Sequence, residues 1–243
     1  MNAIETTALT KRFRDMTAVD ALNLTVEEGE LFALLGVNGA GKTTTIRMLC
    51  GLLAPTGGDA RVMGHSIVTE TAAVKAVIGV SPQETAVGSH LTVEENLALM
   101  AGLHGFYGGD ARRRVGDMLD RLRLGEVRGK RAKTLSGGWM RRLSIAMALI
   151  LEPRVLFLDE PTLGLDVLIR RELWQVVEEL HGKTTVILTT HYLEEAEALS
   201  DRIGVMNRGR LTAVGTAEAL KRQAGAETFE DAFVALAGRG AEQ

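Results

Sequence analysis

The chain has 243 residues, of which 46% are hydrophobic and 24% charged, a balance that can fill the core of one large domain or two small ones. Its net charge of −3 excludes an overall basic surface for nucleic acid, and its single cysteine, Cys50, excludes an internal disulfide. No apolar run reaches the roughly 20 residues that span a bilayer, and no signal peptide is visible, so we expect a soluble intracellular protein.

The first third of the chain is predicted to be rich in strands. Apolar and β-branched runs predict strands at 4–9, 19–26, 31–35, 61–63 and 77–80. A Gly-rich run follows the strand at 31–35 and leads into a helix that begins at Thr44 and ends near Gly51. The sequence PTGG at 55–58 predicts a turn, because Pro and Gly favour turn conformations.

The middle of the chain is predicted to be helical, and the remainder alternates strands with helices. Helices are predicted at 96–100, 111–124, 140–151, 170–181 and 194–200, and strands at 155–158, 185–189 and 203–206. The alternation predicts a parallel, doubly wound sheet into which the helical middle is inserted. The tail after about Gly225 predicts one packed helix through Phe229, Ala232, Phe233 and Leu236.

The run GVNGAGKT at 36–43 matches the phosphate-binding loop G-x-x-x-x-G-K-[ST] without a mismatch. It lies between a predicted strand and a predicted helix, which is the context that the motif requires. Glycines let the backbone approach a phosphate, whose charge then faces backbone N–H groups and the helix N-terminus. Lys42 would reach the terminal phosphates, and the Thr43 hydroxyl would bind magnesium. The predicted nucleotide contacts here are Gly36, Asn38, Gly39, Ala40, Gly41, Lys42, Thr43 and Thr44.

Two acids end the predicted strand at 155–158. Carboxylates at the C-terminal end of a strand lie where open α/β sheets bind ligands. Asp159 is suited to hold magnesium through water, and Glu160 is suited to orient or deprotonate an attacking water. The alternative interpretation is a solvated acidic turn, and the intact phosphate-binding loop in the same chain favours the catalytic one.

The run LSGG at 135–138 opens a predicted helix, with Ser136 at the N-cap position. Together with the two motifs above, this order resembles the ATP-binding cassette (ABC) family, the nucleotide-binding subunits of ABC transporters, over about residues 3–236. The resemblance implies a P-loop NTPase core, with a mostly parallel sheet, flanking helices and an N-terminal antiparallel β subdomain, and an inserted α-helical subdomain. It places the cassette at 1–225, the helical insertion at about 84–152 and a short helical tail at 226–243.

The resemblance also implies roles for single residues. Gln83 would contact magnesium and the attacking water, His191 would be the switch histidine, and Asp166 belongs to the D-loop. Catalysis would fall to Glu160, His191 and Lys42. Phe13 stands where the family usually has a tyrosine that stacks on adenine.

Two cassettes pack head to tail in the family, and each nucleotide is held between them. The resemblance therefore implies that Ser136, Gly137 and Gly138 contact the nucleotide of a second cassette. Trp139 departs from the family pattern, which most often has glutamine at this position.

By resemblance the chain is an ATPase that uses ATP and Mg²⁺ and drives transport, in the export direction, through a separate integral-membrane permease. Its partners would be that permease and a second cassette subunit, either a copy or a homologue, and not nucleic acid. It would lie peripherally on the cytoplasmic face of the membrane. The stretches at 135–143 and 190–197 look like ABC-2-type exporters, including multidrug ATPases.

Two other functions are considered beside transport. A non-transport cassette acting on DNA would carry a long coiled coil in its insertion, and one acting on ribosomes would carry two cassettes, and neither is found in 243 residues. A small-molecule kinase would leave the Ser136 motif and His191 as coincidences.

Some residues are assigned to structure rather than to function. Glu194, Glu195 and Glu197 predict a solvated helix face, and Trp174 is predicted to belong to the core rather than to a ligand site. Cys50 is predicted to be a small core residue on the helix after the phosphate-binding loop.

Overall fold

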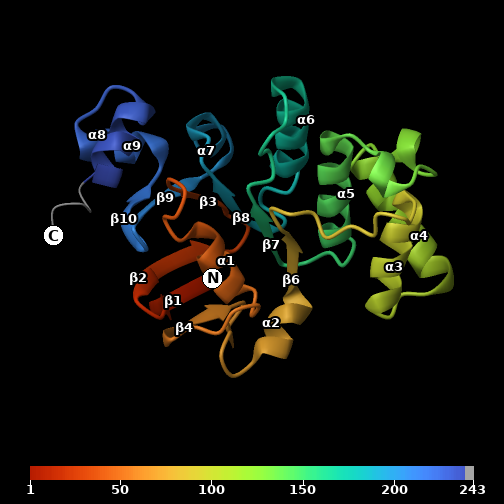
Figure 1. Cartoon of the computed structure of the whole chain (residues 1–243), viewed down its shortest axis with the longest axis horizontal. Coiled ribbons are helices and arrows are strands. Elements are labelled where there is room, and N and C mark those ends of the chain that lie inside the picture. Colours follow the sequence, from red (N-terminus) through yellow and green to blue (C-terminus); the bar gives the residue numbers. More distant parts are fainter. Residues whose placement is uncertain (239–243) are drawn as a thin grey trace.

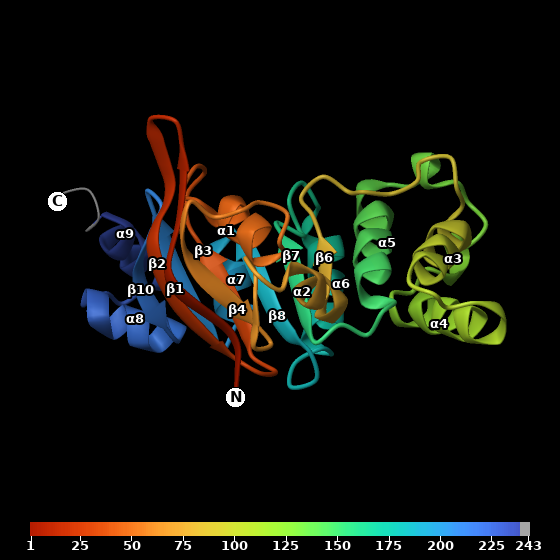
Figure 2. The ribbon, with the colours of Figure 1, turned by 90° about the horizontal axis from the view of Figure 1, so that it is seen from below.

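The structure of the chain is a computed structural model that describes residues 1–238. An antiparallel sheet and the C-terminal helices lie toward one end of the molecule, a mixed sheet lies in the middle, and a group of helices lies at the other end (Figure 1, Figure 2). The predicted combination of a mostly parallel sheet, an antiparallel β subdomain and inserted helices is therefore confirmed. Residues 239–243, the end of the predicted tail, lie outside the described residues.

The N-terminal sheet is a long antiparallel hairpin extended by two shorter strands. Its strands lie in the order β2 (Met16–Glu27), β1 (Asn2–Phe13), β4 (Gly57–Val62) and β5 (His65–Ser66). The tip of the hairpin pairs Phe13 with Met16. Ile4, Leu9 and Val19 are fully buried, as expected of a sheet with one face on the core.

The second sheet is mixed and mostly parallel. Its strands lie in the order β10 (Arg210–Gly215), β9 (Arg202–Asn207), β3 (Leu31–Leu35), β8 (Thr185–Thr190), β7 (Val155–Asp159) and β6 (Ile78–Ser81). β3, β7 and β8 are buried along their whole length, which explains their near-continuous apolar runs. Leu35 lies beside Thr190 and Asp159 beside Thr189, so these three parallel strands end at one edge.

Alternate residues of β3 face two different cores. Phe32 and Leu34 join a core with the N-terminal sheet and with α1 (Lys42–Leu49), so α1 lies between the two sheets. Ala33 and Leu35 face a core formed with α7 (Leu193–Leu199), α8 (Ala217–Ala224) and α9 (Phe229–Gly238). Those helices cover the opposite side of the sheet, together with α6 (Val167–Glu178) (Figure 1).

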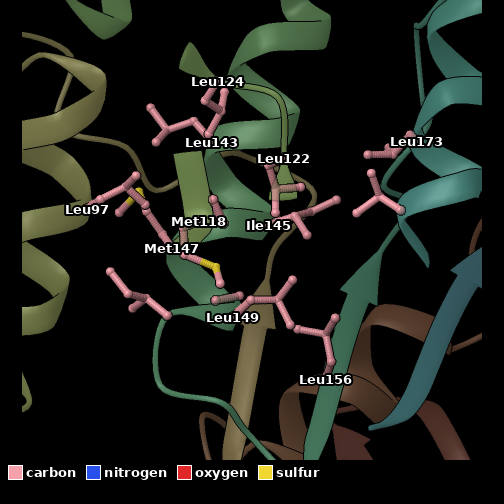
Figure 3. Packing of buried hydrophobic residues seen from close by; sticks show 14 of the residues in the cluster. Leu97, Met118, Leu122, Leu124, Leu143, Ile145, Met147, Leu149, Leu156 and Leu173 are labelled. Atoms are coloured by element: carbon pink, nitrogen blue, oxygen red, sulfur yellow. The ribbon is translucent and has the colours of Figure 1, made fainter. Parts of the chain in front are cut away.

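The helical end of the molecule is built from α3 (Val93–Leu103), α4 (Gly108–Arg121) and α5 (Gly137–Leu149). A capping box of Thr92 and Glu95 begins α3. Leu97, Met118 and Leu143, one from each helix, share a core with Leu156 of β7 (Figure 3). This continuous core fixes the helices to the edge of the sheet that ends in β6.

Some elements differ from the sequence prediction. β4 begins at Gly57, so the turn predicted at 55–58 is wrong in its second half. Val77 ends helix α2 (Thr71–Val77) and does not begin a strand. α2, β10 and α8 have no counterpart among the predicted elements. α2 has one buried residue, Val74, and β10 is a mostly half-buried edge strand, so neither gives a strong apolar pattern.

Helix boundaries also shift. α4, α5 and α6 begin at 108, 137 and 167 rather than at 111, 140 and 170, because their first turns precede the apolar pattern. The predicted tail helix is confirmed by α9, in which Phe229, Ala232 and Leu236 are buried. No helix within residues 1–238 combines the length and the apolar character needed to cross a membrane.

Candidate functional site

A cavity of about 580 Å³ opens where β3 and β7 end and α1 begins. Its lining residues are Met16, Thr17, Ala18, Asn38, Gly39, Ala40, Gly41, Lys42, Thr43, Thr44, Gln83, Glu160 and Arg208. The predicted nucleotide contacts at 38–44 thus face one space. Gln83 and Glu160 come from distant parts of the sequence and face the same space. Open α/β sheets bind ligands at this edge, beyond the C-terminal ends of the strands.

Glycines shape the loop that leads into α1. Gly39 and Gly41 have positive φ angles of 80° and 105°. A Cβ on Gly36 would lie 2.4 Å from the carbonyl oxygen of Met206, and one on Gly41 would lie 2.4 Å from that of Ala18. The loop therefore folds tightly against β2 and β9. Lys42, Thr43 and Thr44 at the start of α1 line the cavity. The N–H groups of a first helical turn have no partner within the helix and suit an anion.

Lys42 carries the positive charge of this loop. Its Nζ donates to the carbonyl oxygens of Gly36 at 2.7 Å and Val37 at 3.3 Å, and it lies 3.6 Å from Oε1 of Glu160. Burial lowers the pKa of the Lys42 ammonium, and the Glu160 carboxylate opposes this shift. The side chain is therefore held in place before any ligand binds, with a carboxylate as its ionic partner.

Two of the three predicted magnesium ligands lie in contact. Oδ1 of Asp159, at the end of β7, accepts hydrogen bonds from the Thr43 hydroxyl at 3.2 Å and from the Thr189 hydroxyl at 2.5 Å. Gln83 lines the same cavity and is exposed to it. A hydroxyl, a carboxylate and an amide oxygen form the all-oxygen donor set that Mg²⁺ prefers, so these residues fit that ion.

Glu160 lines the cavity, and His191 contacts its carboxylate. Nδ1 of His191 lies 3.1 Å from Oε2 of Glu160, whose other oxygen faces Lys42. The Glu160 backbone has a positive φ of 48°, and its N–H donates to both the carbonyl and the hydroxyl of Thr189. These bonds hold the carboxylate between a cation and an imidazole at the mouth of the cavity.

Gly36, Asp159 and His191 do not line the cavity themselves but contact residues that do, and the other predicted residues lie outside it. Phe13 lies at the hairpin tip and is 42% exposed, and it does not line the cavity. Ser136 and Gly138 line a separate cavity of about 350 Å³ with Trp139. Asp166 caps α6, its Oδ1 accepting the N–H groups of residues 168 and 169. One copy of the chain therefore does not bring these groups to Lys42, and their roles stay predictions.

Four lining residues were missed by the sequence prediction. Met16, Thr17 and Ala18 reach the cavity from β2, and Arg208 reaches it from the turn between β9 and β10. None belongs to a local motif, because each is placed by pairing between distant strands. The only signal in the sequence was the strand-rich character of the N-terminal region.

Comparison with protein families gives an independent result. The family model described as "ABC transporter" matches residues 19–163. A second model, "AAA domain, putative AbiEii toxin, Type IV TA system", matches residues 135–195. The chain is 47% identical over 228 residues to the daunorubicin/doxorubicin resistance ATP-binding protein DrrA of Streptomyces peucetius, covering 93% of this chain and 69% of the relative.

Other relatives are consistent with this result. The chain is 41% identical over 239 residues to the probable multidrug ABC transporter ATP-binding protein YbhF of Escherichia coli, covering 96% of this chain and 41% of that protein. A solved structure titled as an ATP-binding subunit of an ABC transporter superposes with a TM-score of 0.86 at 30% identity, covering 96% of this chain and 99% of that chain. CbiO1 from Clostridium perfringens, described as part of the ABC transporter complex cbiONQ, gives 0.82 at 28% identity, covering 91% and 92%.

Proposed function

The chain belongs to the ABC transporter family and is an ATP-binding ATPase, and we propose that it works as the energy-supplying subunit of an exporter beside a separate membrane permease. The observation that carries the proposal is a set of contacts at one cavity: Lys42 and Glu160 line it and lie 3.6 Å apart, His191 contacts Glu160, and Asp159 contacts Thr43 of the cavity wall. These groups come from two strand ends, those of β7 and β8, and from the start of α1, and they would supply a cation, a metal ligand, a base and an imidazole.

Lys42 and the N–H groups at the start of α1 would hold the β- and γ-phosphates of ATP. Thr43, Asp159 and Gln83 would hold Mg²⁺, which supplies charge neutralisation to the phosphates when bound. Asp159 already contacts Thr43, so this part of the ligand set is prearranged. Arriving phosphates would compete with Glu160 for the Lys42 ammonium, because both are anions beside the same Nζ.

Glu160, released from Lys42, would accept a proton from a water that attacks the γ-phosphorus in line with the leaving ADP. General-base assistance of this kind contributes about 10²–10⁴-fold to a rate. His191 holds the other oxygen of Glu160 and so sets the orientation of the carboxylate. Phe13 would stack on the adenine from the hairpin tip, with Met16 to Ala18 forming the adjoining wall.

A second cassette would complete the site. Ser136 is the N-cap of α5, yet its side chain accepts no capping hydrogen bond. Its hydroxyl and the first N–H groups of α5, together with Gly137 and Gly138, remain available to the γ-phosphate of a partner's nucleotide. Asp166 begins the segment that would lie at the same contact. These features support a head-to-tail pair of cassettes.

The permease would dock between the sheet and the helical end. A cavity of about 240 Å³ lies there, lined by Ile78, Gly79, Val80, Pro82, Ala86, Met100, His104, Ser144, Met147, Ala148 and Leu151. Arg141 of α5 donates to the carbonyl oxygens of Pro82 and Gln83 at 2.8 and 2.9 Å. A permease segment seated in this cavity would thus be linked through Arg141 to the loop of Gln83, which lines the nucleotide cavity. The docked chain would lie on the cytoplasmic face.

Affinity purification from detergent-solubilised cells tests the proposal. A tagged copy of the full chain should retain a polytopic membrane protein and hydrolyse ATP in a magnesium-dependent manner. Recovery of only soluble partners, ribosomes or DNA would overturn the transporter role in favour of a soluble cassette ATPase. Absence of ATPase activity from both the isolated chain and its complexes would overturn the catalytic assignment.

A further inference from the structure

A buried acid next to the site has no role in the mechanism above. The sequence predicts that Glu194, Glu195 and Glu197 form a solvated face, and this prediction is wrong for Glu195, which is 0% exposed. Glu194 and Glu197 are exposed as predicted. A buried carboxylate is costly unless other polar groups compensate it, so its position calls for a physical explanation.

Polar groups from three segments surround Glu195. Nε1 of Trp174, on α6, donates to its Oε1 at 2.9 Å. Burial raises the pKa of Glu195, and the hydroxyls of Thr190 and Thr162, the Trp174 indole and the charge of Arg170 oppose this rise. The second oxygen of Glu195, the Thr162 hydroxyl and Nε of Arg170 are buried with no hydrogen-bond partner within residues 1–238.

Each of these segments leads directly to a residue of the candidate site. Thr162 follows Glu160 by two positions, and Thr190 precedes His191. The hydroxyl of Thr190 also accepts the N–H of Tyr192 at 2.9 Å. Glu195 therefore lies next to both segments that carry the Glu160–His191 contact. One segment follows β7 and carries Glu160, and the other follows β8 and carries His191.

A stack of side chains connects the same cluster to the His191 ring. The guanidinium of Arg170 lies 4.3 Å from the centre of the Tyr192 ring, and the Tyr192 and His191 rings are 4.2 Å apart. Arg170 and Trp174 are one helical turn apart on α6, so both face α7. A charge on Glu195 would attract Arg170, whose guanidinium stacks on the Tyr192 ring.

We propose that Glu195 is a positioning residue for ATP hydrolysis, which joins α6 to the segments 160–166 and 190–192 and so fixes the His191 ring against Glu160. The proposal rests on the function proposed above. It assigns Glu195 no contact with nucleotide, because the residue does not line the nucleotide cavity.

The variant Glu195→Gln tests the charge alone. Glutamine has the same shape, and its amide oxygen can still accept from Trp174, but it no longer attracts Arg170. We expect kcat for ATP to fall about tenfold or more, with KM within about twofold of the wild-type value, because phosphate binding is untouched. The matched control is Glu194→Gln on the exposed face of the same helix, which should change neither constant.

A double-mutant cycle separates positioning from general stability. In a His191→Ala background, Glu195→Gln should lower kcat by less than about a further twofold, because the imidazole ring that Glu195 positions is absent. The proposal would be overturned if Glu195→Gln lowered kcat equally in both backgrounds. It would also be overturned if the single variant left kcat unchanged, whether or not it raised KM. If Glu195→Gln fails to fold, as judged by thermal unfolding, Trp174→Phe removes one donor to Glu195 and enters the same cycle with the same criteria.

The outcomes also separate this proposal from the proposed function. If Lys42→Ala and Glu160→Gln lose ATPase activity while Glu195→Gln keeps the wild-type kcat, the positioning role alone is wrong. If the wild-type chain shows no magnesium-dependent ATPase activity, the function itself is wrong.

Discussion

The ammonium of Lys42 lies 3.6 Å from the carboxylate of Glu160, and both side chains are more than nine-tenths buried. The cation of the phosphate-binding loop is therefore already neutralised by the proposed catalytic base. A phosphate that entered the cavity would replace the Glu160 carboxylate as the anionic partner of Lys42. The buried ammonium would then not be left unpaired. The same exchange would free Glu160 to act as the proposed base.

Replacement of Lys42 by alanine should weaken nucleotide binding and lower turnover by about 10²-fold or more, because a preorganised charge is removed from the phosphates. Steady-state ATPase assays and nucleotide titration measure the two effects. Lys75→Ala, at an exposed lysine on α2, is the control and should behave as wild type. Near wild-type turnover in Lys42→Ala would contradict the assignment.

Replacement of Glu160 by glutamine should preserve ATP binding but reduce the rate by about 10²–10⁴-fold, since the amide cannot accept the proton of the attacking water. Unhydrolysed ATP should then hold two cassettes together, and size-exclusion chromatography with ATP and magnesium would detect the dimer. Glu178→Gln, an exposed residue on α6, serves as the control. A monomeric variant with normal hydrolysis would refute both the base and the paired cassettes.

Charges placed in the proposed permease cavity should uncouple transport. Met100→Glu and His104→Glu alter its α3 wall without touching the nucleotide cavity. We expect transport, measured in cells or vesicles, to fall while the ATPase activity of the isolated chain stays within about twofold, because only a docking contact is lost. Asp120→Lys, an exposed charge reversal on α4, should leave transport intact. Normal transport by both cavity variants would place the permease elsewhere.

Cys50 offers a direct measure of unfolding. It is 1% exposed at the end of α1, and burial raises the pKa of its thiol, so the reactive thiolate is suppressed. A thiol reagent such as DTNB should react slowly with the native chain at pH 8 and rapidly, with one equivalent, in denaturant. ATP should slow the native reaction further, because ligand binding favours the folded state. Cys50→Ala, the control, should not react with DTNB. Rapid labelling of the native wild-type chain would contradict the prediction and show that α1 opens readily.

The predicted site residues that lie together in the structure are mostly those that belong to local sequence motifs. The loop at 36–44 and the acids after β7 depend on a strand, a turn and a helix start, which a short stretch of sequence specifies by itself. The parallel register then brings Asp159 and His191 to one edge, as the alternation of strands and helices implies. Gln83 reaches the same cavity from β6.

Residues placed by packing between distant elements escaped the prediction. Glu195 lies among acidic residues in a short helix, and the packing of that helix against α6 and the segments after β7 and β8 buries it. Met16 and Arg208 line the nucleotide cavity through strand pairing that no local pattern specifies. Phe13 is aromatic as the prediction requires but does not line that cavity, whereas Met16, its partner at the hairpin tip, does.

The positive φ of Glu160 has a consequence for the balance between folding and activity. A non-glycine residue in the left-handed region costs roughly 1–2 kcal/mol, and burial of a carboxylate adds to that cost. Glycine or asparagine would adopt this backbone more easily, yet neither supplies a base. Folding alone would therefore disfavour glutamate at position 160, as expected if the chain gives up some stability there for the proposed base.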